Sequence, residues 1–224
     1  MDVNKDRRKM FVTTSAETFI RSNLVWRPVP DLPGISLWQA GPASRLSSLY
    51  DNLTGDGPAP FWAFVWGGGM GLARYIYDHR DQFEGQRVYD VGTGSGLVAI
   101  AAAQAGASCV TACDIDMYAC EATRLNAQAN NVDLTVQRGN ACSQPVPDTD
   151  ILTVGDLFYD ADTAKALLPW LKACLARGIR ILIGDPGRAY LPASRLKKLA
   201  MYPGYDFAGE NQASSPNAVF ELMD

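Results

Sequence analysis

From residue 87 onward, short apolar runs alternate with longer segments whose apolar residues recur every three or four positions. The short runs are typical of buried strands, and the longer segments are typical of amphipathic helices. Strands are predicted at Arg87 to Val91, Cys109 to Cys113, Leu134 to Val136, Ile151 to Val154 and Ile179 to Ile183. Helices are predicted between them, at Leu97 to Ala105, Met117 to Asn130 and Ala161 to Ala176. This alternation indicates a mostly parallel α/β sheet with helices on both faces.

The C-terminal third departs from the alternation. A helix is expected at Ala193 to Met201, and two strands follow it, Tyr205 to Phe207 and Ala218 to Leu222. Because no helix separates these two strands, they are expected to form an antiparallel pair at one edge of the sheet.

The N-terminal region is less regular. Thr14 and Glu17 have the spacing of a capping box, which predicts a short helix through Phe19 and Ile20. Three prolines between residues 28 and 33 then indicate an extended arm leading into Ile35 to Trp38. We expect residues 1–60 to form this helix and arm, packed on a core domain at 61–224.

The stretch between the arm and the first regular strand contains two further predicted elements. Thr54 to Pro60 is rich in glycine and proline and is expected to be a loop. A helix is expected to follow Gly71, with Leu72, Tyr75 and Ile76 on its buried face.

Composition narrows the functional classes. The chain has 224 residues, of which 47% are hydrophobic, and a net charge of −4, so a nucleic-acid partner is not favoured. No apolar stretch reaches the roughly 18 residues of a membrane span, and the N-terminal residues lack the apolar run of a secretory signal. Five cysteines without paired spacing and the single His79 form no recognisable zinc site or Ser-His-Asp triad. We expect reduced thiols and a cytoplasmic location.

The most informative stretch is VYDVGTGSG, in which a strand meets a glycine-rich loop. Asp90 leads the loop, and Gly92, Gly94 and Gly96 alternate with Thr93 and Ser95. Glycines at a strand-to-helix turn can adopt positive φ and let a ligand approach the backbone closely. A tight turn without a ligand is the alternative.

Asp114 favours the ligand-binding interpretation. It ends the next strand about 20 residues further on, where a carboxylate can accept both hydrogen bonds of a ribose diol. Leu97 stands where a dinucleotide fingerprint has its third glycine, which disfavours NAD or FAD and leaves an NAD dehydrogenase as the weaker alternative. The acidic Asp90 also suits a ligand with an amino end better than one with a diphosphate.

This combination resembles the class I S-adenosylmethionine-dependent methyltransferases. The resemblance implies a Rossmann-like sheet of seven strands, mostly parallel, with an antiparallel C-terminal pair. It also implies that Asp90 to Gly96 cradle the cofactor and that Asp114 binds its ribose. By position, Asn140 and Ala141 would lie against the adenine, although relatives often carry Asp where this chain has Asn140.

A closer resemblance rests on five segments in a fixed order. They are PFWAFVWGGGMGLARYI from Pro60, VYDVGTGSGLVAIAAAQAGA from Val88, DIDMYACEATRLNAQAN from Asp114, GDLFYD from Gly155 and IGDPGRAYLP from Ile183. Together they resemble the family of lysine methyltransferases that act on the electron transfer flavoprotein β subunit. The likeness runs from about Phe19 to the C-terminus. It implies S-adenosylmethionine as cofactor, no metal, and the flavoprotein β subunit as the protein partner.

The segment GDLFYD contains the acidic-x-x-aromatic motif that this group shares after its fourth strand. In a parallel sheet, ligands lie beyond the carboxyl ends of the strands, so Asp156 is expected beside the reactive methyl group. Asp156, Phe158 and Tyr159 are then the predicted catalytic residues, with Asp156 also touching the cofactor. Asp156 would orient the acceptor amine rather than act as a strict general base. The alternative is that it caps the following helix, although Asp160 is nearer to that position.

Two further sites have open alternatives. Trp66 is expected to contact the cofactor while the following glycines bend the chain around it; otherwise Trp62, Phe64 and Trp66 are core aromatics of a strand-like segment. Asp185 to Arg188 fit a type II turn, which would either be a plain turn or, with Tyr190, line the substrate entrance.

Protein-lysine methylation is the leading functional hypothesis. The alternatives are a small-molecule N-methyltransferase of the nicotinamide type and a module that binds a partner without catalysis.

Overall fold

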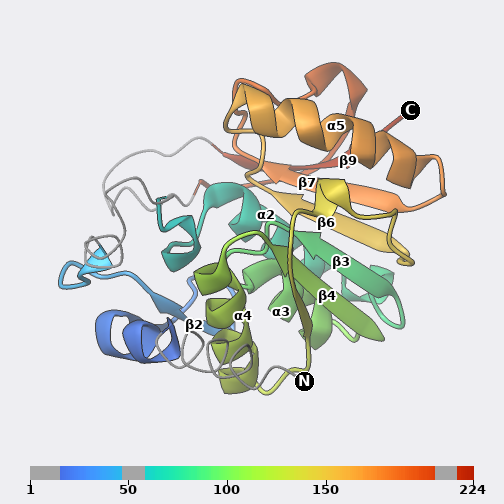
Figure 1. The fold of residues 1–224 in the computed structure, drawn as a ribbon. Helices are drawn as coiled ribbons and strands as arrows, with labels where there is room; N and C mark the ends of the chain where they lie inside the picture. Colours follow the sequence, from blue (N-terminus) through green and yellow to red (C-terminus); the bar gives the residue numbers. More distant parts are fainter. Residues whose placement is uncertain (1–15, 47–58, 205–215) are drawn as a thin grey trace, which may run out of the picture.

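The computed structural model describes residues 16–46, 59–204 and 216–224 (Figure 1). A helix is observed at 16–23, where the sequence predicts one. The expected cap Thr14, most of the expected loop Thr54 to Pro60 and the expected strand Tyr205 to Phe207 lie outside the described residues. Within the described ranges, none of the helices is both long and apolar enough to span a bilayer.

Seven strands form one sheet in the order β5-β4-β3-β6-β7-β9-β8. Their bounds are β3 Arg87–Val91, β4 Cys109–Asp114, β5 Thr135–Arg138, β6 Ile151–Gly155, β7 Arg180–Asp185, β8 Leu196–Tyr202 and β9 Asn217–Leu222. The strands from β3 to β7 pair in parallel, whereas β9 runs antiparallel to both β7 and β8. The predicted fold class, including the antiparallel C-terminal pair, is confirmed.

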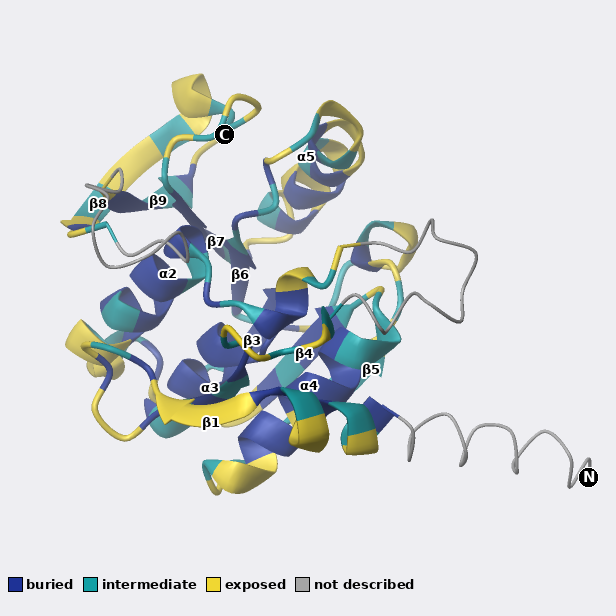
Figure 2. Ribbon diagram, turned by 90° about the vertical axis from the view of Figure 1, so that its left-hand side faces the viewer, coloured by how far each residue is buried: buried dark blue, intermediate teal, exposed yellow. Residues whose placement is uncertain are grey.

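Helices cover both faces of the sheet (Figures 1 and 2). On one face lie α2 (Gly67–Asp78) and α3 (Leu97–Gln104), with α4 (Met117–Ala129) beside α3; on the other lies α5 (Ala161–Leu175). The strand side chains alternate accordingly, because successive residues of a strand point to opposite faces. In β7, Leu182 packs in the core cluster of α2 and α3, whereas Ile181 and Ile183 pack in the cluster of α5.

The N-terminal arm is attached to α4. Its strands β1 (Val25–Pro28) and β2 (Ser36–Gln39) form a separate antiparallel pair. Asn126 accepts a hydrogen bond from the Trp38 N–H at 2.8 Å, and Asn130 both accepts from and donates to the backbone of Ser36. Asn126 of α4 and Asn130, the C-cap of that helix, therefore hold the edge of the arm through side-chain hydrogen bonds to backbone groups that would otherwise bind water.

The structure corrects the prediction for the start of α2. The helix begins at Gly67, before Gly71, so the glycines form its first turn and do not bend the chain around Trp66. A Cβ on Gly68 would lie 2.1 Å from the Gly184 carbonyl oxygen. The glycines thus allow the N-terminus of α2 to approach the backbone of β7 closely. The stretch before α2 is also not strand-like, because Phe61–Ala63 form a 3₁₀ helix.

The helix predicted at Ala193 to Met201 is wrong. A single 3₁₀ turn at Ala193–Arg195 is followed by β8. This strand lies at the sheet edge and pairs with β9, with a register shift between Lys198 and Ala200. Pairing with β9 overrides the helical preference of these leucine, lysine and alanine residues, which periodicity alone does not anticipate.

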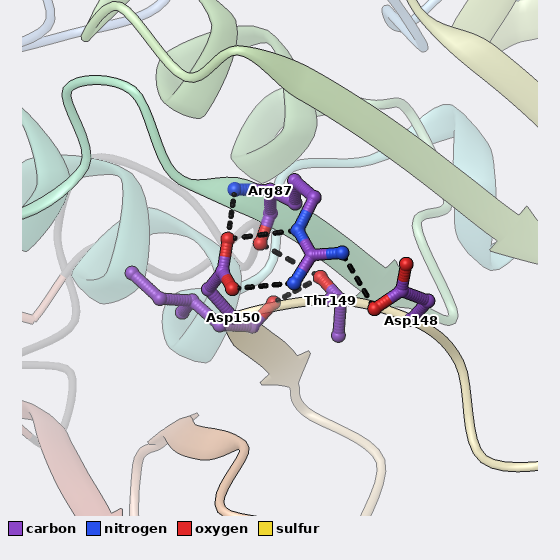
Figure 3. Close-up of polar contacts among 5 residues, drawn as sticks. Arg87, Asp148, Thr149 and Asp150 are labelled. Carbon is purple, nitrogen blue, oxygen red and sulfur yellow. Dashed lines mark hydrogen bonds and ion pairs between the residues drawn. The ribbon is translucent and has the colours of Figure 1, made fainter.

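At the N-terminal ends of β3 and β6, Arg87 joins the two strands (Figure 3). The Asp150 carboxylate accepts from the Arg87 N–H at 2.8 Å and from its Nη2 at 2.7 Å, and the Thr149 hydroxyl donates to the Arg87 carbonyl. A cavity of about 590 Å³, lined in part by Arg87, Asp148 and Asp150, opens here. It lies at the opposite end of the strands from the glycine loop.

Candidate active site

The glycine-rich loop has the predicted form between β3 and α3. Gly92, Gly94 and Gly96 have φ angles of 65°, 55° and 84°. A Cβ on Gly92 would lie 2.7 Å from Leu157 Cδ2, and one on Gly96 would lie 2.9 Å from Thr123 Cγ2. Side chains are thus excluded at both positions by conformation and by space. Leu157 also shows that the segment after β6 lies directly against this loop.

Asp114 holds the loop from the neighbouring strand. One carboxylate oxygen accepts from the Gly94 N–H at 2.9 Å, and the other accepts from the Asp116 N–H at 3.0 Å. Burial raises the pKa of Asp114, and the hydrogen bonds from Asp116 and Gly94 partly offset this effect. Since a carboxylate offers about four lone-pair sites, Asp114 can still accept hydrogen bonds from a diol placed at the loop.

Asp90 lies beneath the loop and is almost completely buried. One of its carboxylate oxygens accepts a hydrogen bond from the Thr153 hydroxyl at 2.7 Å. Within the described part of the chain, its second oxygen and the Thr93 hydroxyl have no partner of good hydrogen-bond geometry, although Thr93 and the Ala99 N–H lie near enough to lower the pKa of Asp90. Burial raises the pKa of Asp90 to about 6. Buried polar groups in native proteins are nearly always paired, so these two atoms fit a cradle that is completed by a ligand or by water.

Asn140 lies next to Asp114 at the end of β5. The Gly139 N–H donates to the Asp114 carbonyl oxygen at 2.8 Å, and the Asn140 side chain accepts from the Cys142 N–H at 3.0 Å. Asn140 is exposed and Ala141 is buried. The structure thus brings Asn140 to the same edge of the sheet as the glycine loop, where its amide also caps a short 3₁₀ turn.

Asp156 follows β6, which pairs with β3, and it lies at the N-terminus of α2. Its Oδ2 accepts from the Gly69 N–H at 2.9 Å, and its Oδ1 accepts from Arg188 Nη2 at 2.7 Å. The φ angle of Asp156 is 57°, which is rare for a residue with a side chain. Burial raises the pKa of Asp156, and Arg188 and the Gly69 N–H oppose the rise. Such backbone strain at a buried charged residue is typical of a functional site.

Asp156 does not cap α5. Asp160 does, because its carboxylate accepts from the Asp162 and Thr163 N–H groups. Asp156 instead accepts a hydrogen bond from the Gly69 N–H. This N–H is one of those in the first turn of α2 that have no partner within the helix, and the helix dipole favours a negative charge there.

The two rings of the motif after β6 lie in different environments. Phe158 has no exposed surface and packs in the core cluster beneath α5. Tyr159 is 48% exposed, and its ring centre lies 5.8 Å from that of Phe61. The structure therefore does not bring Phe158 and Tyr159 together in one open slot.

Trp66 and Tyr159 both contact the ring of Phe61. The Trp66 indole N–H donates to the Phe61 carbonyl oxygen at 2.7 Å, and the two ring centres are 5.6 Å apart. The Arg188 guanidinium lies 5.9 Å from the Trp66 ring centre. We call Phe61, Trp66 and Tyr159 the aromatic rim. Trp66 thus lies near Arg188, the partner of Asp156. Trp62, by contrast, is a buried core residue that stacks on Tyr118.

The turn after β7 has features both of a plain type II turn and of a lining for the substrate entrance. Asp185 is fully buried, and one of its carboxylate oxygens accepts from the Gly187 and Arg188 N–H groups at 2.7 and 2.6 Å. Gly187 has a φ of 99°, as the third residue of a type II turn requires. Asp185 therefore stabilises the turn, while Arg188 reaches Asp156 and Tyr190 is 46% exposed.

Comparison with known proteins agrees with this geometry. A protein from Caenorhabditis elegans named "Electron transfer flavoprotein beta subunit lysine methyltransferase homolog" is 38% identical over 193 residues, covering 74% of this chain and 79% of that protein. The chain belongs to the electron transfer flavoprotein β-subunit lysine methyltransferase family. The Danio rerio relative in this family is 41% identical over 143 residues, 63% of this chain. Those residues cover 55% of that protein, so the chain spans about half its length.

More distant comparisons agree on the fold of this family member. The family "Ribosomal protein L11 methyltransferase (PrmA)" matches residues 74–154, which include the glycine loop. The crystal structure of a putative RNA methyltransferase from Pyrococcus horikoshii has a TM-score of 0.57 at 13% identity and covers 80% of this chain and 97% of that one. At this low identity, the structural match shows only a shared methyltransferase fold.

The residues at the loop fit a cofactor that has a ribose and an amino end. Asp114 can bind a diol, and Asp90 and Thr93 offer buried polar atoms that have no partner of good geometry among the described residues. In the same part of the chain, no group of three or more His, Cys, Asp or Glu side chains is placed to hold a metal ion.

Sequence reasoning missed three features of the site. The Gly69 N–H was not expected to bind Asp156, because the two residues are far apart in sequence. Phe61 was not recognised as part of the rim, although it is 47% exposed. Ile115 is 68% exposed directly after Asp114 and offers apolar surface beside the loop. The sequence does contain a signal for Ile115, because an isoleucine stands between two aspartates directly after a strand.

Proposed function

We propose that this chain is an S-adenosylmethionine-dependent protein-lysine N-methyltransferase and that its acceptor is the electron transfer flavoprotein β subunit. The names of its relatives support the choice of reaction and acceptor. The observation that carries the proposal is the position of Asp156. A buried carboxylate, fixed by a backbone N–H and an arginine, follows the strand next to the glycine loop and adjoins an exposed aromatic rim.

In this proposal the residues of the loop hold the donor. Asp114 would accept hydrogen bonds from the ribose hydroxyls, Asp90 would face the amino end, and Ile115 and Asn140 would flank the base. When bound, S-adenosylmethionine supplies an electrophilic methyl group on a sulfonium sulfur, which takes the electron pair of the broken bond as the nitrogen–carbon bond forms. Holding the acceptor in line with that methyl group can contribute on the order of 7 kcal/mol to the lowering of the barrier.

The acceptor amine is oriented by Asp156. A lysine that passes over the exposed surfaces of Tyr159 and Phe61 can place its apolar stem on the rings and its nitrogen at the carboxylate. The free lysine has a pKa of about 10.4, and desolvation lowers the pKa of an amine. The proton leaves the nitrogen for solvent, and Asp156 accepts a hydrogen bond from the amine without becoming the final base.

An exposed acceptor site suits a protein substrate. Phe61 is 47% exposed and Tyr159 is 48% exposed, so among the described residues the rim is accessible to a surface lysine. The net charge of −4 supports a protein partner over a nucleic acid. Five free cysteines support a reducing compartment such as the cytoplasm, which we propose as the location.

Incubation with labelled S-adenosylmethionine and purified flavoprotein β subunit tests the proposal. We expect label on β-subunit lysines, and we expect Asp156→Ala to reduce the rate by on the order of 100-fold or more while the protein still binds S-adenosylhomocysteine. Unlabelled β subunit together with methylated nicotinamide would replace this function by small-molecule methylation. Absence of any heat on titration with either cofactor form would indicate a module without catalysis.

A further inference from the structure

We propose that Arg188 is a positioning residue of the acceptor site, which holds Asp156 ionised and oriented toward the incoming amine. The inference rests on the proposed methyl transfer and adds a residue to its acceptor side. It starts from the contact between the Arg188 guanidinium and Asp156 Oδ1, with distances of 2.7 Å from Nη2 and 3.2 Å from Nε. A fork of two N–H donors on one carboxylate oxygen fixes both groups more firmly than a single hydrogen bond does.

Arg188 is itself held in place at its backbone. Its N–H donates to the buried Asp185 carboxylate at 2.6 Å, within a turn that Gly187 completes with a positive φ. The guanidinium also lies against the Trp66 ring, at 5.9 Å from its centre. Because both ends of Arg188 are fixed, the guanidinium is a built part of the site. A side chain that merely occupied the slot until the substrate arrived would not need such a fixed backbone.

The orientation of Asp156 leaves room for an amine. Its Oδ1 takes two N–H donors of Arg188, whereas its Oδ2 takes only the Gly69 N–H and keeps a further lone pair for the amine. The Asp156 side chain is 10% exposed and the Arg188 side chain is 27% exposed. The ion pair is therefore open to the solvent on one side. The exposed Tyr159 of the aromatic rim stands three residues after Asp156 in the chain.

The charges around Asp156 explain why an arginine is needed. The charged side chains that act on it are Arg188, which favours the carboxylate, and the buried Asp185, which disfavours it. On the side of α2, Asp156 faces the N-terminus of the helix, where it accepts a hydrogen bond from the Gly69 N–H. Without Arg188, two buried carboxylates would be left with no cation between them. One would then take up a proton, or both would hold the lysine as an ammonium ion, which has no lone pair for attack.

Arg188 thus has two effects on the acceptor. It keeps Asp156 in the form that accepts a hydrogen bond, and its positive charge disfavours protonation of a nearby amine. Both effects extend the pH range in which the enzyme is active toward lower pH. Removal of the charge should therefore move the acid limb of the pH–rate profile to higher pH, whereas a purely structural arginine would change the rate without moving the limb.

The test compares Arg188→Gln, which removes the charge, with Arg188→Lys, which keeps it, and uses the exposed Arg195→Gln as a matched control. We expect Arg188→Gln to lower kcat at neutral pH by on the order of tenfold to a hundredfold and to raise the acid-limb pKa by about one unit or more. Arg188→Lys should retain the wild-type limb with a smaller loss of kcat, because a lysine lacks the fork. Arg195→Gln should match the wild type in kcat and in the acid-limb pKa.

A second measurement needs neither cofactor nor substrate. In protein labelled with carboxyl-¹³C aspartate, the Asp156 signal is identified by its loss in Asp156→Asn and followed through a pH titration. Arg188→Gln should titrate Asp156 at a pKa higher than in the wild type by about one unit or more. An unchanged titration, an unchanged acid limb or a faster reaction in Arg188→Gln would each overturn the inference. If the NMR shift is found while the wild type methylates no β subunit, the proposed function fails and the assignment of Arg188 to Asp156 stands.

Discussion

The Gly69 N–H donates a hydrogen bond of 2.9 Å to the Asp156 carboxylate, although the two residues are 87 positions apart. The contact exists because three glycines remove Cβ atoms between α2 and the ends of β6 and β7. A Cβ on Gly155 would lie 3.2 Å from Gly69, and one on Gly184 would lie 2.0 Å from the Gly68 carbonyl oxygen. The close packing of a helix N-terminus on two strands therefore positions the acid of the acceptor site.

Gly68 and Gly69 form a matched pair for testing this packing. Gly68→Ala places a methyl group 2.1 Å from a backbone oxygen, which the sheet cannot move away from easily. We expect a loss of about 2 kcal/mol or more in the free energy of unfolding. In Gly69→Ala the nearest atom to the new Cβ is 3.9 Å away, so the higher helix propensity of alanine should leave the protein as stable or up to about 1 kcal/mol more stable. Denaturant titration measures both values, and equal stability of the two variants would contradict the packing argument.

Phe158 and Tyr159 allow structural and functional roles to be separated. Phe158→Ala removes a completely buried ring and should lower the free energy of unfolding by about 3 to 5 kcal/mol. Tyr159→Ala removes a half-exposed ring and should cost less than about 1 kcal/mol, while it lowers methyl transfer to the β subunit through a higher KM. Tyr159→Phe is the control that keeps the ring. A large loss of stability in Tyr159→Ala would place its ring in the core instead of the rim.

The central parallel strands and the glycine loop could be predicted because their signals are local. An apolar run of β-branched residues, as in Ile179 to Ile183, reports burial directly, and the positive-φ positions of the loop require glycine. Asp114 could be placed because it ends the strand beside the loop.

The rest depends on contacts between distant segments. Lys197 and Lys198 have the preferences of a helix, yet pairing with β9 makes them part of an edge strand. The glycines at the start of α2 were predicted to form a bend, because glycine disfavours helix. Only their contact with β7 explains why glycine is needed there. For Arg188 the sequence left both a plain turn and the substrate entrance open, and its pairing with Asp156 depends on how the turn after β7 folds back.

The Arg87–Asp150 pair should make stability depend on pH in the acid range. Hydrogen bonds from Arg87 lower the pKa of Asp150 to about 2, below the value of about 3.9 expected in the unfolded chain. A lowered pKa means that the stabilisation is complete above about pH 4 and is lost as the pH falls through about 2. We expect Asp150→Asn to have a lower Tm than the wild type at pH 5 and a smaller drop in Tm between pH 4 and pH 2. The exposed Asp133→Asn serves as the control, and parallel Tm curves for Asp150→Asn and the wild type would contradict the prediction.

Asp90 should couple cofactor binding to pH. Burial raises the pKa of Asp90 to about 6, so at pH 5 it is mostly neutral and at pH 7 mostly ionised. If the ionised form faces the amino end of the ligand, the affinity for S-adenosylhomocysteine should rise between pH 5 and pH 7, with a limiting slope of about tenfold per pH unit below the pKa. Calorimetric titration measures this slope, which should become shallower in Asp90→Asn.

The same residue should act in the opposite direction on the stability of the unliganded protein. An acid whose pKa is raised by folding stabilises the fold while it is protonated, so its contribution is greatest below about pH 4 and declines as the pH rises through about 6. Asp90→Asn removes this ionisation and should therefore raise the Tm at pH 7.5 while it weakens cofactor binding at that pH. Loss of both stability and binding in Asp90→Asn would show that its hydrogen bond from Thr153 stabilises the fold more than the buried charge destabilises it. That result would remove Asp90 from the group of residues that hold the cofactor at a cost in stability.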